Sequence, residues 1–266
     1  MSPDQTPAPV PSAAHVSRRI EEGNPWYIGD QFAVQLGAPG TRATVERNWQ
    51  IFRDFIRRWA RDGDAARPVR TLDCGCGDGL NLRALAAIAA ELDRRQYLVG
   101  CDYNGLRLGR VRSAKLAEAA FRGSLLALPV AAGAFDILLC NHVLEHIVED
   151  DVALREMHRV LAPGGLLILG VPNEGCAFAR LRNKLLQRNI ARTTDHVQFY
   201  RKATLLQRMA AAGFRIEDFR TIGFFVPHLR VFTWLSNRAW GRKCLEKLGA
   251  RFPGQAAGLV VAAVRT

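Results

Sequence analysis

The stretch LDCGCGDGLNL, Leu72–Leu82, decides how the rest of the chain is interpreted. An apolar segment ends at Asp73, and a pattern typical of a helix begins near Leu80. Between them every second position is glycine, at Gly75, Gly77 and Gly79. Because glycine has no Cβ, the backbone can turn tightly and lie against a ligand, and the first amides of the following helix are unpaired. The stretch therefore predicts a strand, a ligand-binding turn and a helix.

Short apolar segments alternate with segments of helical periodicity on both sides of this turn. Five strands are expected, at Val69–Asp73, Tyr97–Asp102, Ala119–Phe121, Phe135–Asn141 and Leu166–Pro172. The helices among them are expected at Leu80–Leu92, Leu106–Ala117 and Asp150–Leu161. This alternation is typical of an α/β fold in which helices cover both faces of a doubly wound, mostly parallel sheet.

The last third of the chain completes this pattern. A helix is expected at Ala203–Ala212, and strands at Phe214–Ile222 and Gly258–Arg265 bring the sheet to seven strands. An unpaired terminal strand would be a liability at a sheet edge, unless it inserts into the sheet. Residues 223–257, between the last two strands, form a long insertion that is rich in apolar and basic side chains.

The first part of the chain is expected to add a tail and one helix to a single domain. Residues 1–17 contain four prolines among small polar residues, so they should form a disordered tail. Bulky apolar residues then recur at steps of three and four, which predicts an amphipathic helix over 41–62. The domain itself would span 18–266.

Composition places the chain among ordinary globular proteins, with 266 residues, 48% hydrophobic and 23% charged. Its beginning lacks the basic start and apolar core of a signal peptide, and no apolar run is long enough to span a bilayer. The six cysteines form no regular framework and are expected to be free thiols in a reducing compartment. We therefore expect a cytoplasmic protein.

The net charge of +12 is concentrated at one end of the chain. Residues 172–266 carry 17 lysines and arginines but only 5 acidic residues. Such an excess favours an anionic partner, such as a phosphate-bearing substrate, an anionic membrane surface or nucleic acid, although a solvated, arginine-rich surface is an equally good explanation. No run of five basic residues occurs, which argues against a nucleic-acid-binding tail.

The glycine turn resembles a known family once its spacing is considered. Glycines at G-x-G-x-G behind an aspartate differ from the G-x-G-x-x-G of dinucleotide sites. Asp73–Gly79, together with Asp102, resembles the nucleotide half of class I S-adenosylmethionine-dependent methyltransferases. Further stretches resemble the family in order, at Gly123–Ile147, Leu154–Asn173 and Asp195–Ile216. The resemblance implies a Rossmann-like fold with an antiparallel last strand and S-adenosylmethionine as cofactor.

The resemblance also implies a role for each matching residue. Asp73 would face the methionine amino group, and Asp102 would hold the ribose hydroxyls. Tyr103 would pack near the adenine. The family usually has an acid at the position of Ser124, so that hydroxyl or the backbone of Leu125 would bind the adenine amino group instead. The remaining cofactor contacts would come from Gly75, Gly77, Gly79 and Asn141.

Proton transfer from an acceptor needs a base, and histidines follow the fourth expected strand. His142, His146 and His196 are the candidate catalytic residues, with Glu145 as a further base. His142, Glu145 and His146 would share one face of a helix. This spacing resembles ubiquinone-biosynthesis O-methyltransferases and would suit a metal, but we expect a structural helix start without one. His196 follows a basic stretch that could cover the site.

These observations lead to one functional hypothesis and its rivals. We expect O-methylation of a glycan, lipid-linked or phosphate-bearing acceptor, with Trp234 and Trp240 of the 223–257 insertion touching an anionic membrane. The alternative for this insertion is a cap over the pocket. The alternatives for the function are methylation of a soluble small molecule such as a quinone precursor, and a non-catalytic nucleotide-binding or NAD-dependent protein. Nucleic-acid methylation is disfavoured, because Asn141-His142-Val143-Leu144 stands where a Pro-Pro-aromatic motif would be expected.

Overall fold

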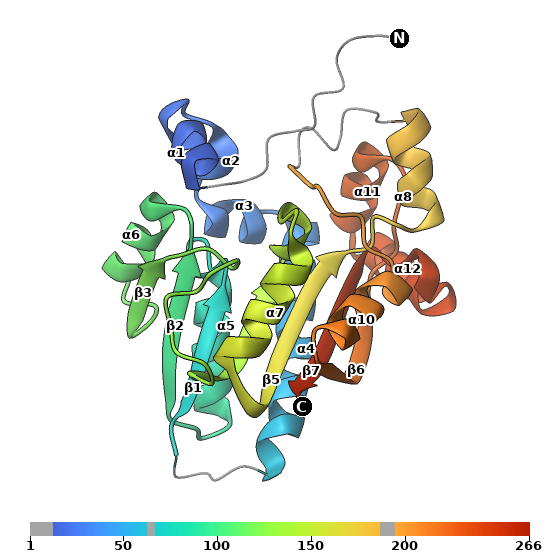
Figure 1. Cartoon of the computed structure of the whole chain (residues 1–266). Helices are drawn as coiled ribbons and strands as arrows, with labels where there is room; N and C mark the ends of the chain where they lie inside the picture. The colour runs from blue at the N-terminus through green and yellow to red at the C-terminus, as the bar shows by residue number, and fades with distance from the viewer. Residues whose placement is uncertain (1–12, 63–66, 187–194) are drawn as a thin grey trace, which may run out of the picture.

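The computed structural model describes residues 13–62, 67–186 and 195–266. Its strands form one sheet in the order β3-β2-β1-β4-β5-β7-β6 (Figure 1). They are β1 (Val69–Cys74), β2 (Gln96–Asp102), β3 (Ala119–Arg122), β4 (Phe135–Asn141), β5 (Leu161–Pro172), β6 (Phe214–Ile222) and β7 (Gly258–Arg265). The expected seven-stranded α/β fold is confirmed.

The direction of the strands follows the expectation as well. Strands β1 to β5 pair in parallel, and β7 runs antiparallel to both of its neighbours, β5 and β6. The last strand is therefore inserted into the sheet, so both of its edges are paired. Strand β6 forms the edge of the sheet instead.

Helices cover both faces of the sheet. They are α1 (Ala13–Glu21), α2 (Pro25–Ile28), α3 (Gln31–Gly37), α4 (Pro39–Trp59), α5 (Leu80–Glu91), α6 (Gly105–Ser113), α7 (Asp150–Val160), α8 (Ala177–Leu181), α10 (Lys202–Ala211), α11 (Leu229–Ser236) and α12 (Ala239–Arg251). On one face Leu154 of α7 and Met209 of α10 belong to a buried apolar cluster. On the other face Phe52 of α4 and Leu85 of α5 belong to a second cluster.

Several boundaries differ from the sequence-based prediction. Ala13–Ser17, expected in the disordered tail, form the first half of α1, whereas residues 1–12 lie outside the described part of the chain. The helix expected over 41–62 begins at Pro39, because proline suits the first turn of a helix. Strand β5 begins at Leu161, which pairs with Phe135 ahead of an irregularity in the register.

The 223–257 insertion folds into α11 and α12, followed by a short 3-10 turn. The two helices pack on each other, and α11 approaches the start of α4, where the amide of Gly40 donates to Oδ1 of Asn237 at 3.0 Å. Within the described ranges, no helix is both long and apolar enough to cross a membrane. All six cysteines are free thiols, as expected.

The order of the strands locates the candidate site. Strand β1 lies between β2 and β4, and the chain winds away in opposite directions from this point. In open α/β sheets a crevice forms there, outside the carboxyl ends of the strands. The helices α1 to α3 lie across this end of the sheet in Figure 1.

Candidate active site

The glycine turn between β1 and α5 has a backbone that only glycine adopts readily. The angle φ is +75° at Gly75, +55° at Gly77 and +91° at Gly79. A Cβ on Gly77 would lie 2.1 Å from Oε1 of Gln31, and a Cβ on Gly75 would lie 2.3 Å from Val143. Glycine is therefore required both for the conformation and for the close approach of other groups.

Asp73 is the penultimate residue of β1, just before this turn, and is fully buried. Neither of its carboxylate oxygens has a hydrogen-bond partner within the described residues. Burial, reinforced by the charge of Asp102, raises the pKa of Asp73 from 3.8 to about 8. A buried carboxylate without partners is costly, so a ligand ammonium group would fit this position.

Asp102 ends β2 and is held by backbone amides. Its Oδ2 accepts from the amide of Gly77 at 2.7 Å, and its Oδ1 accepts from the amide of Asn104 at 2.8 Å. Burial raises the pKa of Asp102, while these two hydrogen bonds oppose the shift. Since each carboxylate oxygen has a second lone pair, this fixed carboxylate can still accept from ligand hydroxyls.

A cavity of about 180 Å³ lies beside these residues. Most of the residues expected at the site line it, namely Gly75, Gly77, Asp102, Tyr103, Leu125, His142 and His146. The structure therefore brings together residues from β2, from the glycine turn and from the loop after β4.

Four of the expected site residues lie outside the cavity wall in addition to the buried Asp73. Gly79 faces the end of α6 and the residues after it, where a Cβ would lie 2.7 Å from Leu116. Ser124 accepts from the amide of Leu126 at 3.0 Å and so shapes a turn. Asn141 packs against Gly170 of β5. His196 lies behind His146, with ring centroids 4.9 Å apart.

The N-terminal segment forms a wall of the cavity that the sequence analysis missed. Val16, Tyr27 and Gln31 line the cavity. The amide of Gln31 donates to Oδ2 of Asp78, and Oε1 of Gln31 accepts from the amide of Asp78, both at 2.8 Å. No local pattern in the sequence reveals this wall, because Gln31 and Asp78 are 47 positions apart and the charge of Asp78 is paired with Arg110.

The histidines meet in an arrangement that differs from the expected helix face. Only a single 3-10 turn, Leu144–His146, follows β4, and His142 precedes it with φ at +57°. Nδ1 of His142 lies 3.3 Å from Oε1 of Glu145. His196 joins this group from the loop before α10, so the chain brings together residues about 50 positions apart.

Burial and neighbouring charges shift the pKa values of His146, His142 and Glu145 in different ways. Burial lowers the pKa of His146, which leaves its ring neutral at pH 7. Desolvation also lowers the pKa of His142, but its hydrogen bond to Glu145 and the charge of Glu145 outweigh this and raise it overall. Burial raises the pKa of Glu145, yet His142 more than compensates, so the pKa lies below its usual value and the carboxylate is ionised.

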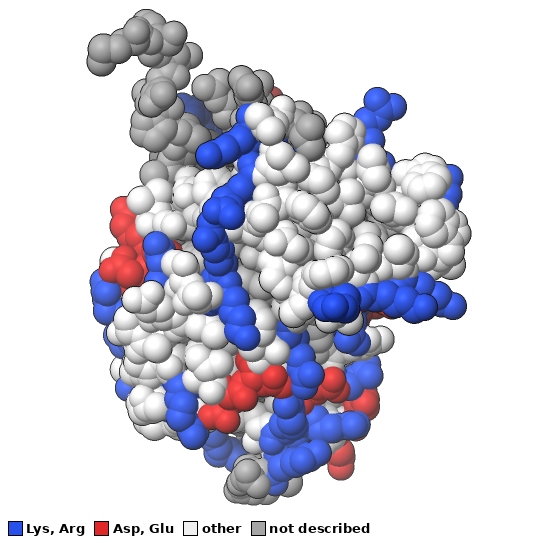
Figure 2. All heavy atoms as spheres, turned by 90° about the vertical axis from the view of Figure 1, so that its right-hand side faces the viewer, with Lys and Arg blue, Asp and Glu red and all other residues white. Residues whose placement is uncertain are grey.

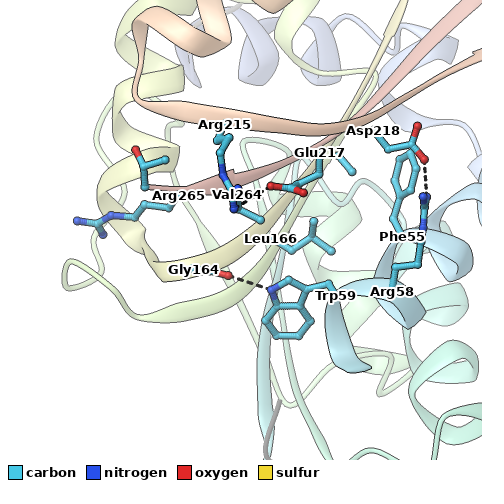
Figure 3. Close-up of a pocket in the computed structure, with 12 residues that line it drawn as sticks. Phe55, Arg58, Trp59, Gly164, Leu166, Arg215, Glu217, Asp218, Val264 and Arg265 are labelled. Carbon is cyan, nitrogen blue, oxygen red and sulfur yellow. Dashed lines mark hydrogen bonds and ion pairs between the residues drawn. The ribbon is translucent and has the colours of Figure 1, made fainter. Parts of the chain in front are cut away.

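A larger hollow, of about 690 Å³, lies elsewhere on the molecule (Figure 3). It is formed by α4 and by strands β5, β6 and β7, at the amino end of β5. Several of its polar groups are paired within the chain: Arg58 pairs with Asp218 at 2.6 Å, and the Trp59 indole donates to the carbonyl of Gly164 at 3.0 Å. Nε of Arg265 is buried there without a hydrogen-bond partner in the described residues. We place the active site at the smaller cavity, because it lies outside the carboxyl ends of the strands and is lined by the glycine turn, beside the buried Asp73 whose two carboxylate oxygens have no partner in the described residues.

Comparison with known proteins identifies the family of the chain. Residues 44–218 match the model of a family described as a methyltransferase domain. The chain belongs to this methyltransferase family. The match covers the glycine turn, strands β1 to β5 and most of β6, so the superfamily that the sequence resembled, the class I S-adenosylmethionine-dependent methyltransferases, is confirmed.

Relatives and solved structures agree with the family. The methyltransferase is 29% identical over 154 residues to a protein of Mycolicibacterium smegmatis named as a probable S-adenosylmethionine-dependent methyltransferase, covering 58% of this chain and 54% of that protein. It is 31% identical over 179 residues to a ubiquinone biosynthesis O-methyltransferase of Ruegeria pomeroyi, covering 63% of this chain and 70% of that protein. The chain thus spans about half the length of the first of these relatives.

A solved structure from Thermotoga maritima shows the same fold. It is described as an S-adenosylmethionine-dependent methyltransferase, possible histamine N-methyltransferase. The TM-score is 0.59 at 19% identity, and the superposition covers 95% of this chain and 99% of the other. At this identity the likeness defines the architecture of the methyltransferase and leaves its acceptor open.

Proposed function

We propose that this chain transfers the methyl group of S-adenosylmethionine to an oxygen atom of a glycan, lipid-linked or phosphate-bearing acceptor. The observation that carries the proposal is Asp73, a fully buried carboxylate without a hydrogen-bond partner in the described residues, beneath a glycine turn. The cofactor supplies a methyl group that is already activated, so much of the protein's task is positioning.

Each cofactor-binding residue has a proposed task. Asp73 would hold the methionine ammonium group, with the backbone of Gly75 and Gly77 alongside. Asp102, fixed by the amide of Gly77 at 2.7 Å, would accept from the ribose hydroxyls. Tyr103 and Leu125 line the cavity and would contact the adenine. The supporting positions, which shape these loops from outside the cavity, are Gly79, Ser124 and Asn141.

The histidines would remove the acceptor's proton. Nδ1 of His146 lies 3.1 Å from the carbonyl of Asp195, which can only accept, so Nδ1 carries the hydrogen and Nε2 has a free lone pair. Nδ1 of His196 is similarly engaged by Glu174 at 2.7 Å. His142, with its side chain 51% exposed, stands at the cavity wall. The neutral imidazole of His146, which also lines the cavity, suits general-base catalysis.

The choice of oxygen as the methylated atom is supported by relatives. Several proteins that match this chain are named ubiquinone biosynthesis O-methyltransferases, including those of Ruegeria pomeroyi and Rhizobium etli. The same names favour the second candidate, a soluble small molecule such as a quinone precursor.

A surface formed by α11 and α12 supports an acceptor at a membrane. Leu229, Trp234 and Trp240 are each at least half exposed. The two tryptophan rings are 5.4 Å apart, and Arg238 stacks over Trp234 at 4.3 Å. Figure 2 shows this side of the molecule, with a broad uncharged area bordered by lysine and arginine. Aromatic rings beside cations suit the headgroup region of an anionic bilayer.

Vesicle co-sedimentation tests this surface. The chain is expected to bind vesicles containing anionic lipid, and to bind them more weakly as salt increases. The double variant Trp234→Ala/Trp240→Ala should lose about tenfold or more of this binding, because about 100 Å² of apolar ring would no longer be buried at each position. Tyr97→Ala, which removes an exposed ring on β2, is the matched control. If Trp234→Ala/Trp240→Ala bound vesicles as tightly as Tyr97→Ala does, the surface would be rejected as a membrane-binding site.

Cofactor titration tests the function itself. Calorimetry should detect binding of S-adenosylmethionine and S-adenosylhomocysteine but not of NAD. A labelled-methyl screen against cell lipid and polar extracts would then separate a lipid-linked acceptor from a soluble one. Binding of NAD, or unchanged cofactor affinity in both Asp73→Asn and Asp102→Asn, would overturn the proposal.

A further inference from the structure

Three potential metal-ligating side chains meet next to the cavity. Glu145, His146 and His196 each bring one ligand atom to within 4.8 Å of the others. Two segments distant in sequence are joined at this point, since the amides of Val197 and Gln198 donate to the carbonyl of Glu145 at 2.9 and 3.0 Å. The backbone therefore holds the three side chains together.

Glu145 has an unsatisfied oxygen at the centre of this cluster. Its side chain is 1% exposed, and its Oε1 lies 3.3 Å from Nδ1 of His142. Its Oε2 has no hydrogen-bond partner in the part of the chain that the structure describes. Burying a carboxylate oxygen without a partner costs free energy, and a cation bound to Oε2 would remove that cost.

The two histidines are oriented by groups behind them. Nδ1 of His196 lies 2.7 Å from Oε2 of Glu174, whose other oxygen accepts from Arg182 at 2.6 Å. Nδ1 of His146 lies 3.1 Å from the carbonyl of Asp195. Metal-binding histidines characteristically donate one ring N–H to a carboxylate or carbonyl, which leaves the other nitrogen free for the ion. Both histidines have this arrangement.

We propose that Glu145, His146 and His196 form a binding site for one divalent transition-metal ion of the class represented by Zn²⁺. Two imidazoles and one carboxylate suit such an ion, whereas Mg²⁺ and Ca²⁺ prefer oxygen ligands. With bonds of about 2.0 to 2.2 Å in tetrahedral geometry, the ligand atoms would lie about 3.3 Å apart. Since the ligand atoms now lie within 4.8 Å of one another, they would have to approach by at most about 1.5 Å on binding.

The position of the site gives the ion a role. His146 also lines the cavity, so an ion held there would present its open position to the acceptor and favour loss of the acceptor's proton. With the ion bound, Nε2 of His146 would be a ligand and could not accept a proton, so the ion would replace His146 in promoting loss of the acceptor's proton. His142 would keep its contact with Oε1 of Glu145 and remain the free imidazole at the cavity wall. This role rests on the proposed methyl transfer, whereas the binding of the ion does not.

Cobalt titration of the full chain, after removal of metals with a chelator, tests the site directly. Co²⁺ is expected to bind with a stoichiometry of about one and to produce visible absorption bands, which Zn²⁺ then abolishes by displacement. His196→Ala and Glu145→Gln should each weaken binding by 100-fold or more, and Glu174→Gln, which alters only the group behind His196, by about 10- to 100-fold. His228→Ala is the matched control and should bind as the natural chain does.

Circular dichroism on each variant separates a lost ligand from a lost fold. If His196→Ala is unfolded, Glu174→Gln and His146→Asn carry the test. The proposal is overturned if the natural chain binds no Co²⁺ or Zn²⁺, or if folded variants of the cluster bind as tightly as His228→Ala. Calorimetry with S-adenosylmethionine on the same samples keeps the two proposals apart, because an absent metal with intact cofactor binding rejects the metal site alone.

Discussion

Replacing Asp73 by asparagine should stabilise the chain and weaken its binding of cofactor. The pKa of this buried carboxyl rises from 3.8 to about 8 in the folded chain. A carboxyl whose folded-state pKa lies above its unfolded value loses stability as pH rises from the unfolded pKa to the folded one. The natural chain should therefore become less stable between about pH 4 and pH 8, and Asp73→Asn should lack this part of the decline.

The size of the effect follows from the shift. At pH 7 the difference between 3.8 and 7 corresponds to about 4 kcal/mol of lost stability. Asparagine removes this loss but leaves a buried amide that lacks partners, which costs about 1 to 3 kcal/mol. Asp73→Asn should therefore be more stable than the natural chain by about 1 to 3 kcal/mol at pH 7, with no such advantage at pH 4.

Cofactor binding should change in the opposite direction. An ammonium group favours the ionised carboxylate, so binding below about pH 8 should release one proton, and affinity should rise about tenfold per pH unit. Asp73→Asn should lose this pH dependence and about 10- to 100-fold in affinity, since a charged hydrogen bond contributes about 1.5 to 3 kcal/mol.

Urea unfolding at pH 4 and pH 7, with calorimetry in buffers of different ionisation enthalpy, measures both quantities. Comparing the two chains at each pH isolates Asp73, because other titrating groups are common to both. If Asp73→Asn were equally destabilised at both pH values, or if the natural chain bound cofactor without releasing a proton, the role given to the buried carboxylate would be refuted.

Three further predictions concern single sites. Gly77→Ala should lose about 1 to 2 kcal/mol of stability, because φ is +55° there, and it should bind cofactor more weakly. Thermal denaturation measures the stability, and Gly109→Ala, at a position with open space around it, is the control. His146→Gln should lower kcat about 100-fold with unchanged cofactor affinity, because the general base is lost. Single-turnover methyl transfer measures the rate, and an equal loss of rate and of cofactor affinity would contradict the role of His146 as a base. Phe52→Ala, at a fully buried position, should cost about 3 to 5 kcal/mol; a urea midpoint near that of the natural chain would show that the α4 face of the sheet is not a packed core.

The strands were the part of the fold that sequence predicted best. The limits of β4, β6 and β7 agree with the prediction at both ends, because each is an apolar or alternating run bounded by turn residues. The start of β5 was missed, because its first pairing, Leu161 with Phe135, lies before a Pro-Gly-Gly stretch that reads as a turn.

The candidate site was only partly predictable. Asp73 and Asp102 could be found from local patterns, because Asp73 lies at the end of an apolar run just before the glycine turn and Asp102 ends the next apolar run along the chain. The cavity wall made by Tyr27 and Gln31 depends on contacts with the glycine turn across more than 40 residues, which no local pattern reveals. The orienting contact of His196 with Glu174, 22 positions away, was missed for the same reason.

The insertion of β7 between β5 and β6 affects how the protein can be made. Strand β6 has β7 as its one neighbour in the sheet, although β6 comes earlier in the chain. While the polypeptide emerges from the ribosome, β6 therefore stays without a partner until the final strand has been translated. The part of the sheet from β3 to β5 can assemble first. It already contains Asp73 and Asp102, the two carboxylates proposed to bind the cofactor.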